Sequence, residues 1–314
     1  MKLLIAYDGS SSADNALDDL QRAGLPKAGV ETLIISVAEV WMPPQTSTNG
    51  DEGFPDYIKE LTEKRHKVAE NSIHEAETMS RHARERVLAH FPDWNVKADV
   101  KNGSPGWEIL FAAEEFEPDL IVVGSQGRNA VGRFLLGSIS QKILREAACS
   151  VRIGRGKIEV DPAPERIIIG FDGSVGSKIA TKEALSRSWP EGTEAALITA
   201  VHSPVPTAIG RFIPPVKEWV EDDIKSETEW IQKTAEDPIE KFKEIGVTAD
   251  VRICEGNPKE VLVEQAAKWQ ADCIFVGAHS YANVLERFLI GSTSAAVAER
   301  ASCSVEVVRQ TVDF

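Results

Sequence analysis

The sequence predicts an α/β protein built from two similar doubly wound domains, each a five-stranded parallel sheet flanked by helices, and we take the strand order 3-2-1-4-5 as a hypothesis that the sequence alone does not fix. Two observations predict this fold. Short apolar runs alternate with helical patterns, which is typical of parallel strands joined by right-handed crossover helices. The chain also repeats itself once along its length. Each copy has the size of a whole domain, about 150 residues, so the repeat indicates two domains rather than a solenoid.

Four segments of the first half recur in the same order in the second. "KLLIAYDGS" matches "RIIIGFDGS", "KNGSPGWEIL" matches "CEGNPKEVLV", "EPDLIVVGS" matches "QADCIFVGA", and "GRFLLGSIS" matches "ERFLIGSTS". The joint reads "GKIEVDPAPER", where Pro162 and Pro164 interrupt regular structure. We therefore assign one domain to residues 1–156 and the other to residues 164–314.

The elements of the first half follow from apolar periodicity and from glycine and proline positions. Gly24 ends the first helix, and Pro105 lies in the first turn of the third. The second helix is long and amphipathic. Strands are predicted at 3–7, 32–40, 96–103, 120–124 and 150–154, and helices at 12–24, 55–91, 105–116 and 138–148.

Composition excludes several classes of function. The formal net charge of -14 argues against a nucleic-acid partner bound through its phosphates. The cysteines show no zinc-ligand spacing and suit buried apolar positions in a reducing compartment; they are Cys149, Cys254, Cys273 and Cys303. The start of the chain does not resemble a signal peptide, and no apolar run approaches the roughly 20 residues that span a membrane. We expect a cytoplasmic protein with no membrane partner.

A glycine-rich turn, "GSQGRNAVGRFLLGS", runs from Gly124 to Ser138 between a predicted strand and a predicted helix. The "DGS" after the first strand is the second turn of interest. In a 3-2-1-4-5 sheet these two turns flank the point where the strand order reverses, and ligands bind there. Gly124 and Gly127 allow close backbone approach to a ligand. The helix that opens at Gly137 offers unpaired amides with partial positive charge.

These features predict a site for a di- or triphosphate. The turn lacks the lysine of a Walker P-loop, so the phosphates would rest on neutral donors, helped by Arg128 or Arg133.

The spacing G-x2-G-x9-G-[ST], given by Gly124, Gly127, Gly137 and Ser138, resembles the nucleotide-binding signature of the universal stress protein family. The "DGS" strand end and the last strand "CSVRIG" also resemble that family. Because the marks occur in both halves, the whole chain resembles a tandem universal stress protein.

The resemblance implies an ATP-binding regulator of a stress response, with Mg²⁺ as an optional companion of the phosphates. Asp8 would reach the nucleoside, and the backbone of Val37 would meet adenine. Gly124 and Gly127 would form the ribose and phosphate turn, followed by the phosphate-binding helix start at Gly137, Ser138 and Ile139. The resemblance also implies that the last strands of the halves pair across a two-fold axis, giving an internal pseudo-dimer; a further homodimer stays open.

The second half departs from the motif. It keeps Asp172, Gly277, Gly291, Ser292 and Thr293, and it has Ala200 at the position of Val37. Ser280 replaces Gly127, and its Cβ disfavours a positive φ. Gly277 and Gly291 are 14 positions apart, against 13 for Gly124 and Gly137. We therefore predict that the first half binds nucleotide and that the second binds weakly or not at all, with the reverse left open.

Other interpretations of the same residues stay open. Each glycine alone also suits a tight strand exit, and Asp8 or Ser10 suits a helix cap. His66, His74, His82 and His90 are too far apart on a helix to share a metal, and no metal site is assigned. No catalytic constellation is evident, so we expect no enzyme beyond a slow ATP hydrolase. A nucleotide-free interaction scaffold is the remaining alternative. Segments 41–58 and 202–220 suit a lid or a surface for an unidentified protein partner.

Overall fold

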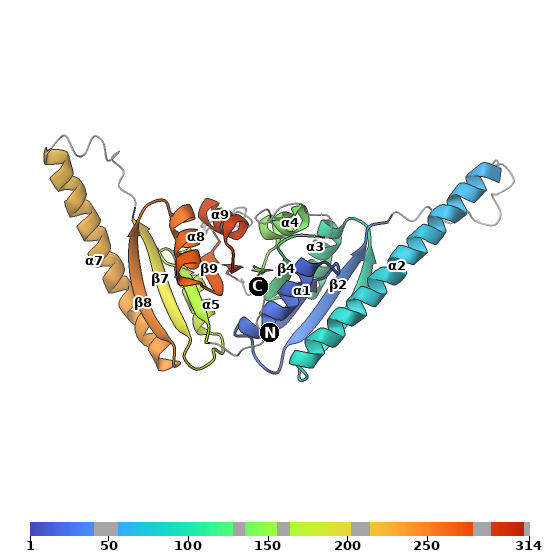
Figure 1. The fold of residues 1–314 in the computed structure, drawn as a ribbon, viewed down its shortest axis with the longest axis horizontal. Coiled ribbons are helices and arrows are strands. Elements are labelled where there is room, and N and C mark those ends of the chain that lie inside the picture. The colour runs from blue at the N-terminus through green and yellow to red at the C-terminus, as the bar shows by residue number, and fades with distance from the viewer. Residues whose placement is uncertain (41–55, 128–135, 156–163, 202–213, 279–289, 311–314) are drawn as a thin grey trace.

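The computed structural model describes residues 1–40, 56–127, 136–155, 164–201, 214–278 and 290–310. Its strands form one sheet of order β3-β2-β1-β4-β5-β10-β9-β6-β7-β8. Each half thus has the predicted order 3-2-1-4-5, and the two sheets join edge to edge at the centre of the molecule (Figure 1). The doubly wound fold is confirmed in both halves. The predicted domain boundary falls at residues 156–163, which lie outside the described residues.

The first half follows the predicted elements closely. It contains β1 (Lys2–Ala6), α1 (Ser11–Asp19), the 3-10 turn η1 (Leu20–Arg22), β2 (Glu31–Ala38), α2 (Asp56–His90), β3 (Asn95–Asn102), α3 (Pro105–Phe116), β4 (Leu120–Gly124), α4 (Ser138–Glu146) and β5 (Ser150–Gly154). The first helix is shorter than predicted, because it tightens into η1 after Asp19, as helix ends often do. Gly24 then turns the chain with φ +62.

The second half repeats this order. It contains β6 (Arg166–Gly170), α5 (Val175–Leu185), β7 (Glu194–Val201), α7 (Pro214–Glu244), β8 (Thr248–Glu255), α8 (Pro258–Trp269), β9 (Cys273–Gly277), α9 (Ser292–Arg300) and β10 (Ser304–Val308). Strand pairs within each half are parallel. The long helices α2 and α7 lie at the two outer ends of the molecule (Figure 1).

The two faces of the sheet are covered differently. On one face each half has its own apolar core, formed with α1 and α2 in the first half and with α5 and α7 in the second. On the other face, residues of α3, α4, α8 and α9 belong to a single core that crosses the junction. Leu4 and Val151 of the first half share it with Ile168 and Val305 of the second. The halves therefore pack as one body.

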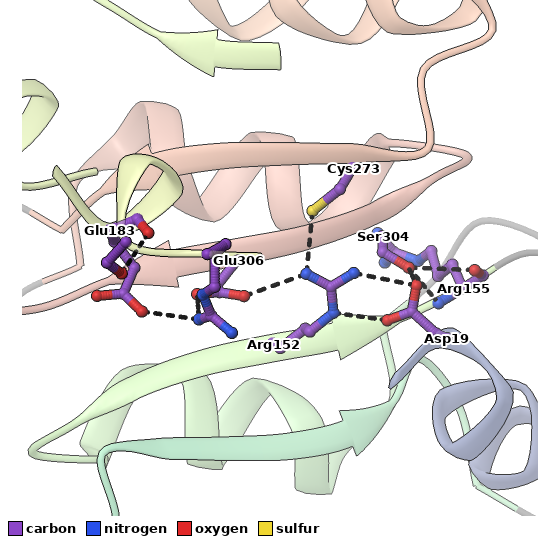
Figure 2. Close-up of polar contacts among 9 residues, drawn as sticks. Asp19, Arg152, Arg155, Glu183, Cys273, Ser304 and Glu306 are labelled. Atoms are coloured by element: carbon purple, nitrogen blue, oxygen red, sulfur yellow. Dashed lines mark hydrogen bonds and ion pairs between the residues drawn. The ribbon is translucent and has the colours of Figure 1, made fainter. Parts of the chain in front are cut away.

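The junction is an antiparallel pair of the last strands, β5 and β10, as predicted. Arg152 lies directly opposite Glu306, and both side chains are fully buried. Arg152 donates from Nη1 to Glu306 Oε2 at 3.1 Å and from Nε to Asp19 Oδ2 at 2.6 Å (Figure 2). Arg187 Nη2 lies 2.5 Å from Glu306 Oε1. Buried charges persist only when paired in this way, so the cluster fixes how the two edges meet.

Three of the four cysteines lie in the buried positions that the sequence predicts. All four thiols are free; Cys149, Cys273 and Cys303 are buried and Cys254 is half-buried. Burial raises the pKa of Cys149 and of Cys303 to about 12, so neither thiol ionises near neutral pH. Within the described ranges, no helix is both long and apolar enough to cross a membrane.

Candidate functional site

The turn after β1 is fixed by its own polar groups. Ser10 caps α1, because its Oγ accepts a hydrogen bond from the backbone N of Ala13 at 3.1 Å. Asp8 Oδ1 accepts from the backbone N of Ser10 at 3.0 Å. The other carboxylate oxygen of Asp8 faces Gly127, where an added Cβ would lie 3.2 Å from Oδ2. The structure therefore brings Asp8 and Gly127 side by side.

Gly124 ends β4 directly against the first turn of α1. A Cβ on Gly124 would lie 2.7 Å from the carbonyl carbon and oxygen of Ser12 and 2.9 Å from the N of Ala13. All three are backbone atoms, which cannot rotate away. Glycine at this position is therefore required by packing alone, whatever binds nearby.

A set of hydroxyl groups that the sequence analysis missed ties the two turns together. The Oγ atoms of Ser12 and Ser125 lie 3.0 Å apart, and the N of Gln126 donates to Ser12 Oγ at 3.0 Å. Ser10 Oγ donates to the carbonyl of Gln126 at 3.4 Å. The repeat holds a signal for this set, because the second half has Gly176 and Ala278 at the positions of Ser12 and Ser125.

The start of α4 closes the site. Gly137 is its N-cap, with φ -62 and ψ 153, and makes no side-chain cap. The N of Gly137 donates to the carbonyl of Ser125 at 2.8 Å, and Ser140 Oγ donates to the carbonyl of Gly124 at 2.7 Å. Ser138 is exposed, while Ile139 is half-buried against the shared core. The first-turn amides of α4 thus lie next to the Gly124–Gly127 turn and have no intrahelical acceptor.

Val37 lies one strand away, near the end of β2. The carbonyl of Ile35 accepts from the N of Tyr7, and the last β1–β2 pair is Ala6 with Ile35. Backbone groups alternate sides along a strand, so the N–H and C=O of Val37 point to the β1 side, beyond the end of the β1 ladder. On the other side, Val37 pairs in register with Lys101.

One argument from the sequence is wrong. The glycines with φ in the left-handed region include Gly9 but not Gly127. The feature that favours glycine at position 127 is therefore the limited space beside Asp8, not a positive φ. Ser280, Arg128 and Arg133, on which other predictions rest, lie outside the described ranges.

The second half builds the same edge more tightly. A Cβ on Gly277 would lie 2.2 Å from the carbonyl oxygen of Gly176, closer than the corresponding approach at Gly124. Ser294 Oγ donates to the carbonyl of Gly277 at 2.7 Å, and Gly291 caps α9 with φ -60. Ser292 is exposed, and Thr293 is half-buried.

In the second half, the side chain of Trp230 covers the "DGS" turn. Gly173 has φ +72, and a Cβ there would lie 2.2 Å from Cη2 of Trp230 on α7. Asp172 is exposed and accepts from the N of Ser174 at 3.0 Å. Partial desolvation raises the pKa of Asp172, but hydrogen bonds from Ser174 and Ser177 outweigh it and hold the pKa below its ordinary value. Ala200, two residues after Ile198, matches Val37 in its place on the strand.

Acidic clusters and the cavity at the junction offer less for a ligand than the edge at Asp8. In the part of the chain that the structure describes, no group of three or more His, Cys, Asp or Glu side chains could hold a metal ion. A cavity of about 320 Å³ lies at the junction, away from both edges, with Asp19, Arg22 and Asp272 in its wall. These three charges are already paired, Arg22 with Asp272 across the junction and Asp19 with Arg152 within the first half, so the cavity is a weaker candidate than the edge at Asp8.

The comparison with known families agrees with this geometry. The model of the universal stress protein family matches residues 1–154 and 164–309. The chain belongs to the universal stress protein family. A universal stress protein of Mycobacterium tuberculosis is 30% identical over 223 residues, which is 69% of this chain and 70% of that protein. One of Mycolicibacterium smegmatis is 25% identical over 308 residues, 98% and 96% of the two chains.

Solved structures match as well. The universal stress protein of Archaeoglobus fulgidus covers 100% of this chain and 97% of its own, with a TM-score of 0.57 at 23% identity, which shows the shared fold. Two single-domain matches carry nucleotides: one universal stress protein in complex with cAMP (22% identity, TM-score 0.33) and one from Arabidopsis thaliana with AMP bound (19%, 0.35). Each match covers 48% of this chain. It covers 99% of the chain with cAMP and 94% of the chain with AMP.

Proposed function

We propose that the first half of the chain binds an adenine nucleotide, ATP foremost, and that the chain acts as a nucleotide-dependent regulator in a stress response. One observation carries the proposal. The Asp8 carboxylate, the Gly124–Gly127 turn and the uncapped start of α4 meet at the carboxyl ends of two adjacent parallel strands. Such a switch point is where doubly wound sheets bind ligands.

The chemistry of this edge suits a nucleotide. The amides at the start of α4 and the positive end of the helix dipole favour phosphate oxygens. A Cβ on Gly137 would come no closer than 3.4 Å to its neighbours, so packing does not demand this glycine, whereas a phosphate on the backbone does. Asp8 offers a carboxylate oxygen to ribose hydroxyls, and the backbone of Val37 offers a donor and an acceptor to an adenine edge.

The second half is proposed as the weaker site or as no site. Gly176 and Ala278 supply no hydroxyl to brace the turn after β9, and Trp230 covers the turn after β6. A Mg²⁺ ion would come with the phosphates, because the described residues do not supply a three-ligand site for it.

The experiment is calorimetric titration of the full chain with ATP and Mg²⁺, beside Gly127→Ala. The added Cβ would lie 3.2 Å from Asp8 Oδ2 and must shift that carboxylate by a few tenths of an ångström, so we expect the variant to lose one binding site while keeping its fold. Ser138→Ala and Ser292→Ala form a matched pair on equivalent exposed positions of α4 and α9; the first should weaken binding and the second should not.

The outcomes separate the alternative functions. Absence of wild-type binding at millimolar ATP would contradict the proposal and favour a nucleotide-free interaction scaffold. Steady release of phosphate during the same incubation would instead favour slow hydrolysis. Equal losses for Ser138→Ala and Ser292→Ala would contradict the assignment of the site to the first half.

A further inference from the structure

The residue that follows each last strand is an arginine whose side chain enters the opposite half. Arg309 follows β10 of the second half. It donates from Nη2 to the carbonyl of Leu144 at 2.6 Å and from Nη1 to the carbonyl of Cys149 at 3.3 Å. Its backbone N donates to Ser150 Oγ at 3.1 Å. All of these acceptors lie in the first half, and Arg309 is buried among them.

Arg155, which follows β5, makes the reciprocal contacts. Its Nη2 donates to the carbonyl of Ala298 at 2.5 Å, and its backbone N donates to Ser304 Oγ at 2.9 Å (Figure 2). Leu144 and Ala298 are the seventh residues of α4 and α9. The halves therefore exchange arginines, and each arginine reaches the last turn of the helix whose first turn forms the candidate site.

The carbonyl groups in the last turn of a helix have no intrahelical donor and carry partial negative charge. Arg309 satisfies one of them on α4 with a cationic donor, which is a recognised way to close a helix end. At the other end of α4, Ser140 ties the first turn to Gly124 at 2.7 Å. Ser138 and Leu144 are about 9 Å apart along the axis at the usual rise per residue, so a short, rigid element connects Arg309 to the phosphate-binding amides.

Resting on the proposed function, we propose that Arg309 is a positioning residue for the nucleotide site of the first half. The second half then contributes to binding without contacting the ligand: its arginine sets the position of α4, and α4 sets the amides that meet the phosphates. Arg155 does the same for α9, so the exchange makes each candidate site depend on the presence of the opposite half.

The test is Arg309→Met in the full chain, with Arg155→Met as the matched control and Arg309→Lys as the conservative variant. We expect Arg309→Met to raise the dissociation constant for ATP about five-fold, the lower end of typical coupling between sites. Arg155→Met should leave that constant unchanged, because its helix belongs to the second half. Arg309→Lys keeps a cationic donor and should restore part of the affinity.

Hydrogen exchange of the same variants, without nucleotide, gives a second readout. Arg309→Met should speed the exchange of amides in α4, including its first turn, and leave α9 unchanged; Arg155→Met should do the opposite. Unaltered exchange in α4, or equal losses of ATP affinity in the two methionine variants, would overturn the inference. Wild-type chain that binds no ATP would overturn the proposed function instead, so the two failures are distinct.

Discussion

The two halves share one strand order and one set of turns, yet they hold the critical edge in different ways. In the first half, Ser12 and Ser125 place two hydroxyl groups between the start of α1 and the turn after β4. In the second, Gly176 and Ala278 leave no hydroxyl there, and the backbone of α5 moves in until Gly277 has no room for a side chain. Both edges have a glycine in backbone contact, but the first is also braced by this pair of hydroxyls, and the second is closed by a tighter contact.

The difference shows that the fold needs a close backbone approach at this edge but does not need the pair of hydroxyls at positions 12 and 125. The second half forms the same edge with the Ser294–Gly277 hydrogen bond and without that pair. The contact between the hydroxyls of Ser12 and Ser125 has no counterpart in the second half, so it is particular to the half that we propose to bind nucleotide. The contrast between the halves is thus a better guide to function than either edge alone.

The largest difference between the halves is expected when a methyl group is added to the glycine that ends β4 or β9. Gly277→Ala and Gly124→Ala each set a Cβ against backbone atoms, at 2.2 and 2.7 Å respectively, and overpacking of this kind costs about 1–3 kcal/mol or more. We expect both variants to unfold at lower temperature, Gly277→Ala most of all, while Gly124→Ala alone also loses ATP binding. Thermal unfolding and ATP titration measure the two effects.

Gly137→Ala is the control for stability, because its Cβ meets no atom closer than 3.4 Å. An unfolding temperature of Gly277→Ala equal to that of the wild type would contradict the contact-closed description of the second half.

A smaller effect is expected when the hydroxyls of Ser12 and Ser125 are removed, because the second half has none at these positions. Ser12→Ala with Ser125→Ala removes the hydroxyl brace, at about 1 kcal/mol for a typical hydrogen bond, or about a five-fold loss in ATP affinity. Calorimetry on the double variant checks this. Ser177→Ala, in the first turn of α5, is the matched control and should leave ATP affinity unchanged. Undiminished affinity in the double variant would show that the brace serves folding only.

The smallest expected effect is on the pH dependence of stability. It concerns an ion pair of Arg22, for which the second half has no charged residue at the equivalent position. Arg22 Nε donates to Glu165 Oε1 at 2.8 Å across the junction, whereas the equivalent position of the second half holds Ser186, the residue that caps the end of α5. Desolvation of Glu165 outweighs this hydrogen bond and raises its pKa from 4.5 to about 7.

The folded chain therefore binds more protons than the unfolded chain between these two pH values, so the stability linked to Glu165 is full at acidic pH and is lost as the pH rises through about 7. Unfolding temperatures measured from pH 5 to 8 should fall less steeply for Glu165→Gln than for the wild type. Glu191→Gln, an exposed neighbour, should keep the wild-type slope; identical slopes for all three chains would count against the buried carboxyl.

Local patterns were enough to predict most of the fold. The helix at Pro105–Phe116 and the strands at Leu120–Gly124 and Ser150–Gly154 match their predicted limits, because a proline, a buried apolar run and bounding turns all lie within each segment. The reason for glycine at 127 could not be predicted, because it depends on an Asp8 rotamer set by a hydrogen bond elsewhere in the chain. The Ser12–Ser125 contact joins residues 113 positions apart, and no local pattern reports such a pair.

Equivalent positions of the last strands, β5 and β10, hold residues of opposite charge. Arg152 and Glu306 are the third residues of β5 and β10, and they face each other across the junction. A residue on a two-fold axis of identical domains always faces its own copy, so arginine would oppose arginine, or glutamate would oppose glutamate. Opposite charges face each other at that point only when the two domains differ, as the two halves of this chain do. Each half thus places at this edge a charge that the other half pairs and that a second copy of itself would repel.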